Sequence, residues 1–171
     1  MIKMRVKKGS ILDASVRRKK FKKLKQQALS KKIMKRLAKS TEDLVYKRVK
    51  SGYGVKGNTK GKLKKLSPRY KKYRKGKPLG EFGTPNKSNL TLTGQMLQAF
   101  GNKVTKNTFN LFIKKTSRKT ITGGSDKHNN AKIAEFVSKL RPFLSLSKPE
   151  ARVIISEYRQ HIKDVARKIF N

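Results

Sequence analysis

The sequence predicts a mixed fold of helices and strands, which three stretches of the chain indicate. Near its end, apolar residues recur at helical spacing over residues 151–169, as on one face of an amphipathic helix. Helix-forming residues prevail over residues 21–50. Between these stretches, Phe109, Leu111 and Ile113 stand on one side in the strict alternation that is typical of a strand.

The first part of the chain is very basic. Residues 1–20 mix basic runs with a few apolar residues, so we expect a flexible arm there. Over residues 21–50 we expect one long helix or two, because Ser-Thr-Glu-Asp at residues 40–43 would cap a second helix. The lysines opposite its apolar face form a solvated surface or contact phosphate groups. That apolar face consists of Leu29, Ile33, Leu37 and Leu44, flanked by Met34, Ala38, Val45 and Val49.

Residues 51–89 form a basic, loop-rich insertion by their composition. A GxGxxG string spans residues 52–57, but no apolar strand precedes it and no acidic residue lies about 20 positions later, so we expect no dinucleotide site. Ser67 would cap a short helix that begins at Pro68. Tyr70 and Tyr73 are interleaved with cations, so they either pack with their hydroxyls in water or stack on nucleic-acid bases.

Weaker patterns fill the region before the last helix. Thr93 is the expected N-cap of a short helix whose apolar face is Met96, Leu97 and Phe100. We expect one strand within residues 104–115 and a shorter one at residues 119–122. Residues 129–138 form either a short helix or a turn and a strand.

The densest apolar cluster precedes the final helix. Pro142 favours an extended conformation for Arg141, and Phe143 and Leu144 follow it directly. Residues 147–150, Ser-Lys-Pro-Glu, then predict a capping box. Its helix packs either on the sheet of its own domain or on a partner. The stripe that must be covered consists of Ala151, Ile154, Ile155, Tyr158, Ile162, Val165 and Ile169.

Charge dominates the composition. The 171 residues include 47 Lys and Arg but only 9 Asp and Glu, for a formal net charge of +38. Asp13, Glu42 and Asp43 are the only acids before residue 80, so the first half is the main basic surface. Such a chain is expected to bind phosphates or acidic protein surfaces. Because it has no cysteine, no signal-like start and no long apolar stretch, we expect a soluble protein made in a cytosol.

The residues needed for catalysis are sparse. His128 and His161 are the only histidines, and neither has the further ligands that a metal site needs. The acids are scattered and do not form carboxylate pairs, and no serine has a credible base beside it. We therefore expect neither an enzyme nor a cofactor.

Four segments resemble, in the same order, the virion morphogenesis or tail-completion family of tailed bacteriophages, which is related to head–tail joining proteins. Arg-Pro-Phe-Leu directly before a final helix is the most specific of them. The segments are residues 66–72 (Leu-Ser-Pro-Arg-Tyr-Lys-Lys), 90–97 (Leu-Thr-Leu-Thr-Gly-Gln-Met-Leu), 130–136 (Asn-Ala-Lys-Ile-Ala-Glu-Phe) and 140–147 (Leu-Arg-Pro-Phe-Leu-Ser-Leu-Ser).

The resemblance implies an α+β fold, in which a long N-terminal helix or helix pair and a small antiparallel sheet are crossed by a C-terminal helix. It implies one tail-completion-like domain over residues 21–171, with a strand at residues 130–136. Arg141 would anchor the extended segment through a carboxylate or backbone carbonyls. The structural motif would comprise Thr93, Gly94, Arg141, Pro142, Phe143 and Leu144.

The function that the resemblance implies is structural. The chain would be a non-enzymatic subunit of the virion neck or tail end, assembled in the host cytoplasm into a homo-oligomeric ring. It would contact other neck, tail or connector subunits and lie close to double-stranded DNA. The alternative is a sequence-nonspecific nucleic-acid-binding protein, such as a packaging or ribosome-associated factor. Candidate contacts to DNA or acidic partners are Lys19, Lys20, Lys22, Lys23, Arg69, Lys71, Lys72 and Arg74.

Overall fold

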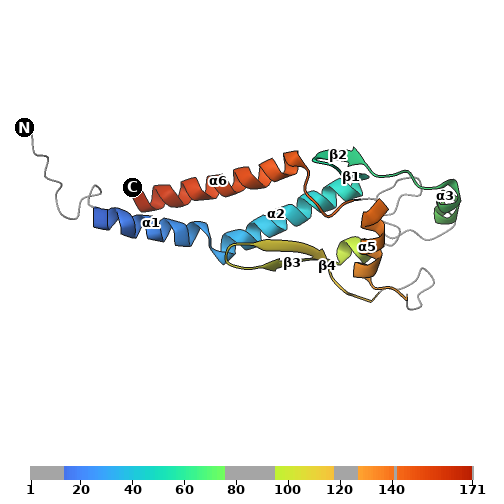
Figure 1. Cartoon of the computed structure of the whole chain (residues 1–171), viewed down its shortest axis with the longest axis horizontal. Coiled ribbons are helices and arrows are strands. Elements are labelled where there is room, and N and C mark those ends of the chain that lie inside the picture. Colours follow the sequence, from blue (N-terminus) through green and yellow to red (C-terminus); the bar gives the residue numbers. More distant parts are fainter. Residues whose placement is uncertain (1–13, 76–94, 118–126, 141, 171) are drawn as a thin grey trace, which may run out of the picture.

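The computed structural model describes residues 14–75, 95–117, 127–140 and 142–170. Its architecture is α+β, as the sequence predicts: a bent N-terminal helix pair, two antiparallel hairpins and a C-terminal helix that packs on them (Figure 1). The predicted motif residues Thr93, Gly94 and Arg141 and the strand expected at residues 119–122 lie outside the described residues.

The N-terminal helix is two helices, α1 (Ala14–Ala28) and α2 (Lys31–Lys50). Ser30 separates them, because its backbone is extended and its hydroxyl accepts the Ile33 N–H at 3.4 Å as an N-cap. The break predicted at residues 40–43 is wrong, since these residues lie inside α2. The flexible arm is also wrong for residues 14–20, which are helical; residues 1–13 are outside the described part.

Helix α6 (Lys148–Phe170) runs antiparallel to the helix pair, along α2 and then α1 (Figure 1). Ile154, Val165 and Ile169 are buried as the helical spacing predicts, but Ile155 is 48% exposed. Helix α6 thus packs mainly on α1 and α2 and also touches β2. Contacts along its length join Glu157 Oε1 to Arg36 Nε at 2.7 Å, His161 Nε2 to the Gln27 carbonyl at 3.3 Å, and the Phe170 ring to the Phe21 ring at 5.4 Å.

The first hairpin pairs β1 (Tyr53–Lys56) with β2 (Thr59–Lys62). Gly57 turns the chain with a φ of 59°, a conformation that favours glycine. The predicted loop character of residues 51–89 is therefore wrong here. Helix α3 (Pro68–Lys75) follows, and the predicted cap is confirmed because Ser67 Oγ accepts the Tyr70 N–H at 3.3 Å.

The second hairpin pairs β3 (Phe100–Val104) with β4 (Phe109–Ile113) and lies against α2. The alternating pattern is confirmed in β4, where Ile113 is buried and Asn110 is exposed. The preceding helix α4 covers only Gln95–Gln98, so Phe100 opens a strand instead of completing the predicted helix. Lys114 N–H donates to the Ala99 carbonyl at 2.8 Å and extends the pairing.

Residues Asn130–Leu140 form helix α5, whose first turn is closed by Asn129 Oδ1 accepting the Lys132 N–H at 2.9 Å. A helix was one of the two alternatives that the sequence left open for residues 129–138. The strand that the resemblance implied at residues 130–136 is wrong. In the described part of this helix, Asn130 and Ala134 are buried.

Two apolar clusters hold these elements together, one at each end of α2. Near its start, α2 packs on α6 through Ile33, Met34, Leu37 and Ile154. Near its end, it packs on α4, the second hairpin, α5 and the segment before α6. This larger cluster contains Val45, Val49, Met96, Leu97, Ala99, Phe100, Ile113, Ala134 and Phe143.

Candidate functional site

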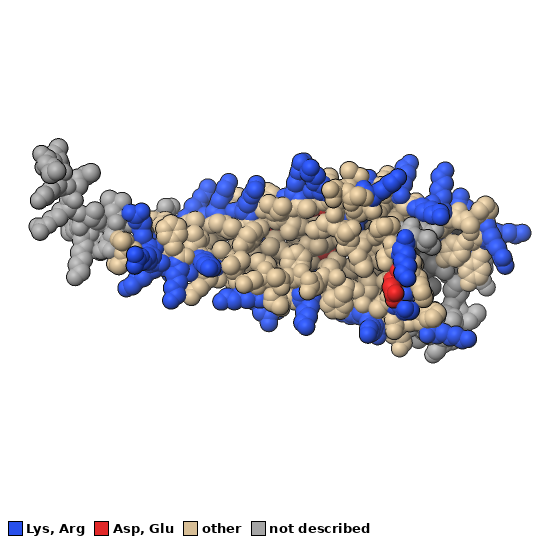
Figure 2. Space-filling view, in the orientation of Figure 1, with Lys and Arg blue, Asp and Glu red and all other residues tan. Residues whose placement is uncertain are grey.

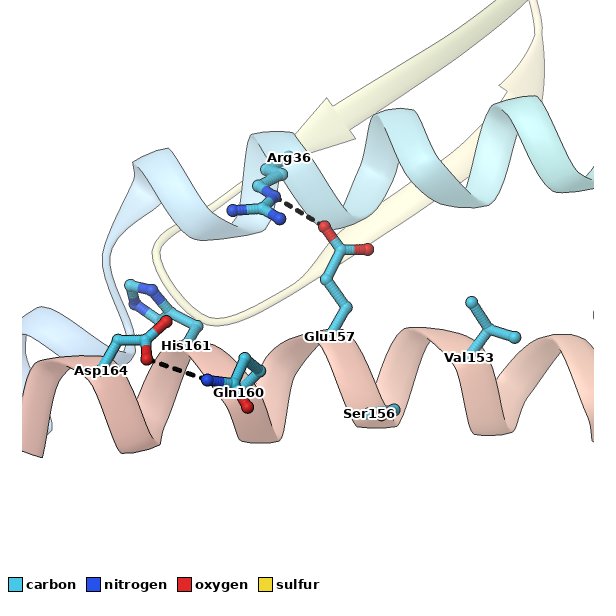
Figure 3. A pocket seen from close by; sticks show the side chains of 7 residues that line it. All are labelled: Arg36, Val153, Ser156, Glu157, Gln160, His161 and Asp164. Carbon is cyan, nitrogen blue, oxygen red and sulfur yellow. Dashed lines mark hydrogen bonds and ion pairs between the residues drawn. The ribbon is translucent and has the colours of Figure 1, made fainter.

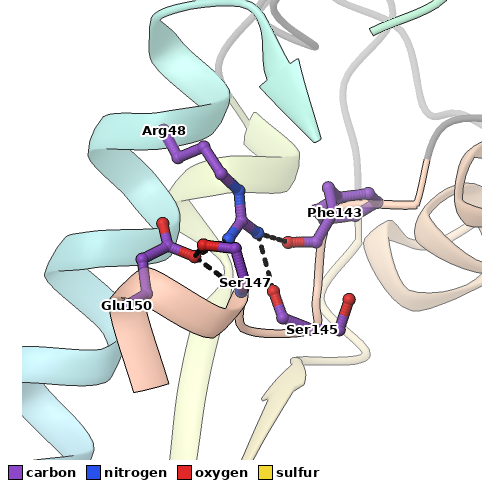
Figure 4. Close-up of polar contacts among 5 residues, drawn as sticks. All are labelled: Arg48, Phe143, Ser145, Ser147 and Glu150. Carbon is purple, nitrogen blue, oxygen red and sulfur yellow. Dashed lines mark hydrogen bonds and ion pairs between the residues drawn. The ribbon is translucent and has the colours of Figure 1, made fainter. Parts of the chain in front are cut away.

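A buried polar cluster surrounds Arg48, near the end of α2 (Figure 4). Arg48 is 3% exposed, and its Nη2 donates to the carbonyls of Phe143 at 2.6 Å and Ser145 at 2.8 Å. Its Nη1 forms an ion pair with the Glu150 carboxylate. Sequence reasoning expected Arg141 to anchor this segment, whereas Arg48 provides such an anchor from another helix. We call these contacts the Arg48 cluster.

The same carboxylate caps helix α6. Glu150 Oε2 accepts the Ser147 N–H at 2.8 Å, which confirms the carboxylate half of the predicted capping box. The Ser147 hydroxyl donates to this oxygen as well, at 2.7 Å. Hydrogen bonds to ionised groups are stronger than neutral ones, so the Arg48 cluster fixes both the position and the direction of α6.

The segment between α5 and α6 is enclosed on both sides. Phe143 is fully buried and Leu144 packs against the same apolar cluster, as predicted. On the opposite side, the Pro142 carbonyl accepts the Val55 N–H of β1 at 3.0 Å. We call residues 142–147 the clasped segment, because it lies between strand β1 and helix α2.

Gly54 allows this close approach. A Cβ on Gly54 would lie 2.4 Å from the Pro142 carbonyl oxygen, and that oxygen is backbone that cannot rotate away. We expect Gly54→Ala to lower the free energy of unfolding by about 1–3 kcal/mol, measured by urea denaturation. The matched control is Gly61→Ala on the paired strand, whose Cβ would lie 3.2 Å from the Lys56 Cβ and 4.0 Å from the Lys56 backbone nitrogen. Equal losses in the two variants would contradict this account of the contact.

Basic side chains are spread around the outline of the molecule (Figure 2). Helix α1 lies at one end and helix α3 at the other (Figure 1), and Lys and Arg side chains gather at both ends and along both long edges of one face (Figure 2). The predicted contact residues therefore do not converge on one site. Lys19, Lys22, Lys23, Arg69 and Lys72 are exposed, whereas Lys20 and Lys71 are half-buried. The Lys20 ammonium lies 5.6 Å from the centre of the Phe170 ring.

Arg74 is the clear correction among the predicted contacts. It is 2% exposed and so cannot serve as a surface contact. The pKa of its guanidinium is lowered by burial, and the charge of the nearby Tyr70 offsets part of this effect. No local pattern signals this burial in a segment as basic as α3.

The two tyrosines of α3 are partly exposed. Tyr70 is 38% and Tyr73 is 47% exposed, and their rings stack with centroids 6.0 Å apart and planes at 19°. The packed arrangement that sequence reasoning allowed is thus replaced by an exposed pair beside Arg69 and Lys72. Such a pair offers flat apolar faces among cations, as single-strand nucleic-acid sites do.

A groove of about 500 Å³ lies between α2 and α6 (Figure 3). Its carboxylates already have partners, since Glu157 pairs with Arg36 and Asp164 Oδ1 accepts from Gln160 Nε2 at 2.9 Å. His161 lies at the same groove and contacts α1 through the Gln27 carbonyl. Across the described ranges, no group of three or more His, Cys, Asp or Glu residues is placed to hold a metal ion.

Comparison of this chain with protein families, curated proteins and solved structures finds no match. In the part of the chain that the structure describes, no helix is both long and apolar enough to cross a lipid bilayer.

Proposed function

We propose that this chain is a non-enzymatic structural subunit of a tailed-phage particle, at the head–tail junction as a tail-completion, terminator or neck component. The observation that carries the proposal is the clasped segment. The residues that resemble the family's Arg-Pro-Phe-Leu element are the ones that join β1, α2 and the start of α6. A motif in this position holds the elements of the subunit together, and this structural role explains it without any substrate.

The charge distribution supports the same proposal. Cations gather at both ends and along both long edges of an elongated subunit, so its ends and its sides suit acidic neighbours (Figure 2). Copies in a homo-oligomeric ring would repel one another unless neck, tail or connector subunits, or DNA in the channel, neutralised them. The proposed location is therefore the virion, after assembly in the host cytoplasm.

Deleting the gene from the phage that encodes it tests this function. We expect full heads and complete but separate tails in electron micrographs, and restored infectivity when the wild-type chain is supplied in trans. Mass spectrometry of purified wild-type particles should detect the chain. Joined and infectious particles that lack the protein would contradict the proposal.

A second candidate is sequence-nonspecific nucleic-acid binding, as in a packaging or ribosome-associated factor. The exposed Tyr70–Tyr73 pair beside Arg69 and Lys72 favours it. This function predicts affinity for any DNA sequence that falls steeply with salt. It also predicts that the chain dissociates from intact particles at high salt, whereas a structural subunit stays with them.

A further inference from the structure

Helix α1 carries a row of cations along one side. Arg18, Lys22 and Lys25 stand four and three residues apart, so their side chains are neighbours along the helix. All three are exposed, and α1 contains no Asp or Glu. We call these three residues the cation row. At 1.5 Å per residue, the row extends about 10 Å along the helix axis.

The cation row ends at a small hollow between α1 and the turn of the second hairpin. The hollow has a volume of about 170 Å³, which is large enough for one phosphate group. We call it the α1 hollow. Its described lining residues are Lys25, Gln26, Leu29, Lys106 and Asn107.

The chemistry of the α1 hollow suits an anion. Lys25 and Lys106 bring ammonium groups from two elements, and Gln26 and Asn107 bring side-chain amides that can donate hydrogen bonds. Its described lining includes no acidic residue. Among the residues that the structure describes, the cation row and Lys106 form no ion pair. An anion that binds here therefore has cations on both sides of it.

Both sides of this site have a firm support. Helix α1 is held on α6 by the Phe21 and Phe170 rings, whose centroids are 5.4 Å apart, and by His161 Nε2, which lies 3.3 Å from the Gln27 carbonyl. The turn of the hairpin is closed by the backbone hydrogen bond from Thr105 N–H to the Thr108 carbonyl, at 2.8 Å. The cations are thus in place before a ligand arrives, which lowers the entropic cost of binding.

We propose that the cation row and the α1 hollow bind the phosphate backbone of duplex DNA. The row is as long as the rise of about three nucleotides of one strand, at roughly 3.4 Å each, so each of its cations can meet a phosphate. Lys106 and the two amides hold a phosphate in the hollow. The inference rests on the proposed function, in which DNA of the channel lies close to the subunit, and it assigns that contact.

Duplex DNA fits this site better than an acidic protein does. Protein interfaces have an apolar centre and are depleted in lysine, whereas DNA interfaces are polar and strongly basic. The cation row contains no apolar residue, and the α1 hollow contributes only Leu29 to such a centre among its described lining.

Duplex DNA also fits better than a single strand. Sites for single strands combine cations with aromatic rings on which bases stack. Phe21 is the one aromatic residue of α1, and its ring already contacts Phe170. The exposed tyrosine pair lies on α3, at the other end of the molecule (Figure 1). The site at α1 therefore offers contacts to phosphates and none to unpaired bases.

Two triple variants that remove the same charge test the cation row. They are Arg18→Gln/Lys22→Gln/Lys25→Gln on α1 and, as the control, Lys32→Gln/Lys35→Gln/Lys47→Gln on α2. All six side chains are exposed and glutamine is a good helix former, so both variants should fold, which circular dichroism verifies. The probe is a short fluorescent DNA duplex, titrated by anisotropy over a range of salt concentrations.

We expect the row variant to bind the duplex at least about tenfold more weakly than the control variant. The slope of log K against log salt should become less steep by about 2–3, since each lost phosphate contact on duplex DNA contributes about 0.9. Equal affinities and slopes for the two variants, or no binding by the wild-type chain, would overturn the site. Deletion of the gene tests the proposed function separately, so separate heads and tails would still support the structural role.

A single substitution tests the α1 hollow. Lys106→Gln removes an ammonium group from the hollow, and Lys103→Gln is the matched control, because it is an exposed lysine of the same hairpin outside the described lining. We expect the salt slope to fall by about 0.9 for Lys106→Gln and by less for Lys103→Gln. Identical slopes for these two variants would show that the hollow holds no phosphate.

A competition measurement separates duplex DNA from other polyanions. Unlabelled duplex, single-stranded DNA and poly-glutamate are each added to the complex of the wild-type chain with the fluorescent duplex. We expect the unlabelled duplex to displace the probe at the lowest concentration of negative charge. More effective displacement by poly-glutamate would assign the site to an acidic protein, and more effective displacement by the single strand would assign it to unpaired DNA; either result would overturn the proposal.

Discussion

Arg48→Met is expected to lower the free energy of unfolding by about 3–5 kcal/mol, because it breaks a buried ion pair from one side. The methionine fills a similar volume, but the Glu150 carboxylate loses its counter-charge and the carbonyls of Phe143 and Ser145 lose their donor. The start of α6 and the clasped segment are both weakened. Urea denaturation followed by circular dichroism measures the loss.

The matched control is Arg36→Met, on the same helix and also paired with a glutamate of α6. Its side chain is 68% exposed, so solvent screens the pair with Glu157 and the expected loss is below about 1 kcal/mol. The double variant Arg48→Met/Glu150→Gln should lose less than the sum of its two single variants, since it leaves no buried charge without a partner. Similar losses for Arg48→Met and Arg36→Met would show that the Arg48 cluster contributes little.

Phe143→Ala is the second large effect, with an expected loss of about 3–5 kcal/mol. The ring is fully buried among residues of α2, α4, α5 and both strands of the second hairpin, so its removal leaves a cavity that five elements cannot readily close. Phe112→Ala is the control, because that ring is 41% exposed, and it should cost below about 1 kcal/mol.

Thermal unfolding of both phenylalanine variants measures the difference, and a higher melting temperature for Phe112→Ala is the expected result. If Phe143→Ala instead unfolded at the wild-type temperature, the clasped segment would be a surface feature. The proposed role of the Arg-Pro-Phe-Leu element in the architecture of the subunit would then lose its support.

Patterns that repeat within one element were predictable. The stripe from Ile154 to Ile169 and the cap at Ser147 are set by helical period and local hydrogen bonding. The alternation from Phe109 to Ile113 is likewise contained in one strand. In each case the side chains that decide the structure are close in sequence, so the pattern shows without knowledge of the fold.

Features that depend on a distant partner were missed. Strand β3 has few apolar residues, and it is a strand because β4 pairs with it. The first hairpin was read as loop because its glycines favour loops, whereas Gly54 serves the approach of Pro142. Ser30 was overlooked as a cap because the acidic run at residues 40–43 gave a stronger local signal.

Arg48 itself is the most instructive omission. One more cation among 47 attracts no notice, and the carbonyls that it binds lie 95 and 97 residues away. One signal was present: Thr41, Val45 and Arg48 follow one another at helical spacing on the buried face of α2. A basic residue inside an apolar stripe is a candidate for a buried ion pair, and this rule would have found it.

The sequence separation within the Arg48 cluster has a consequence for biosynthesis. Helix α2 is made long before Glu150, which follows Arg48 by 102 residues, a delay of about 5–20 seconds at roughly 5–20 residues per second. During that interval the part of α2 that packs on α6, around Ile33, Met34 and Leu37, lacks its partner helix. Native folding therefore finishes only after α6 leaves the ribosome. Until then, chaperones that shield nascent chains can bind α2.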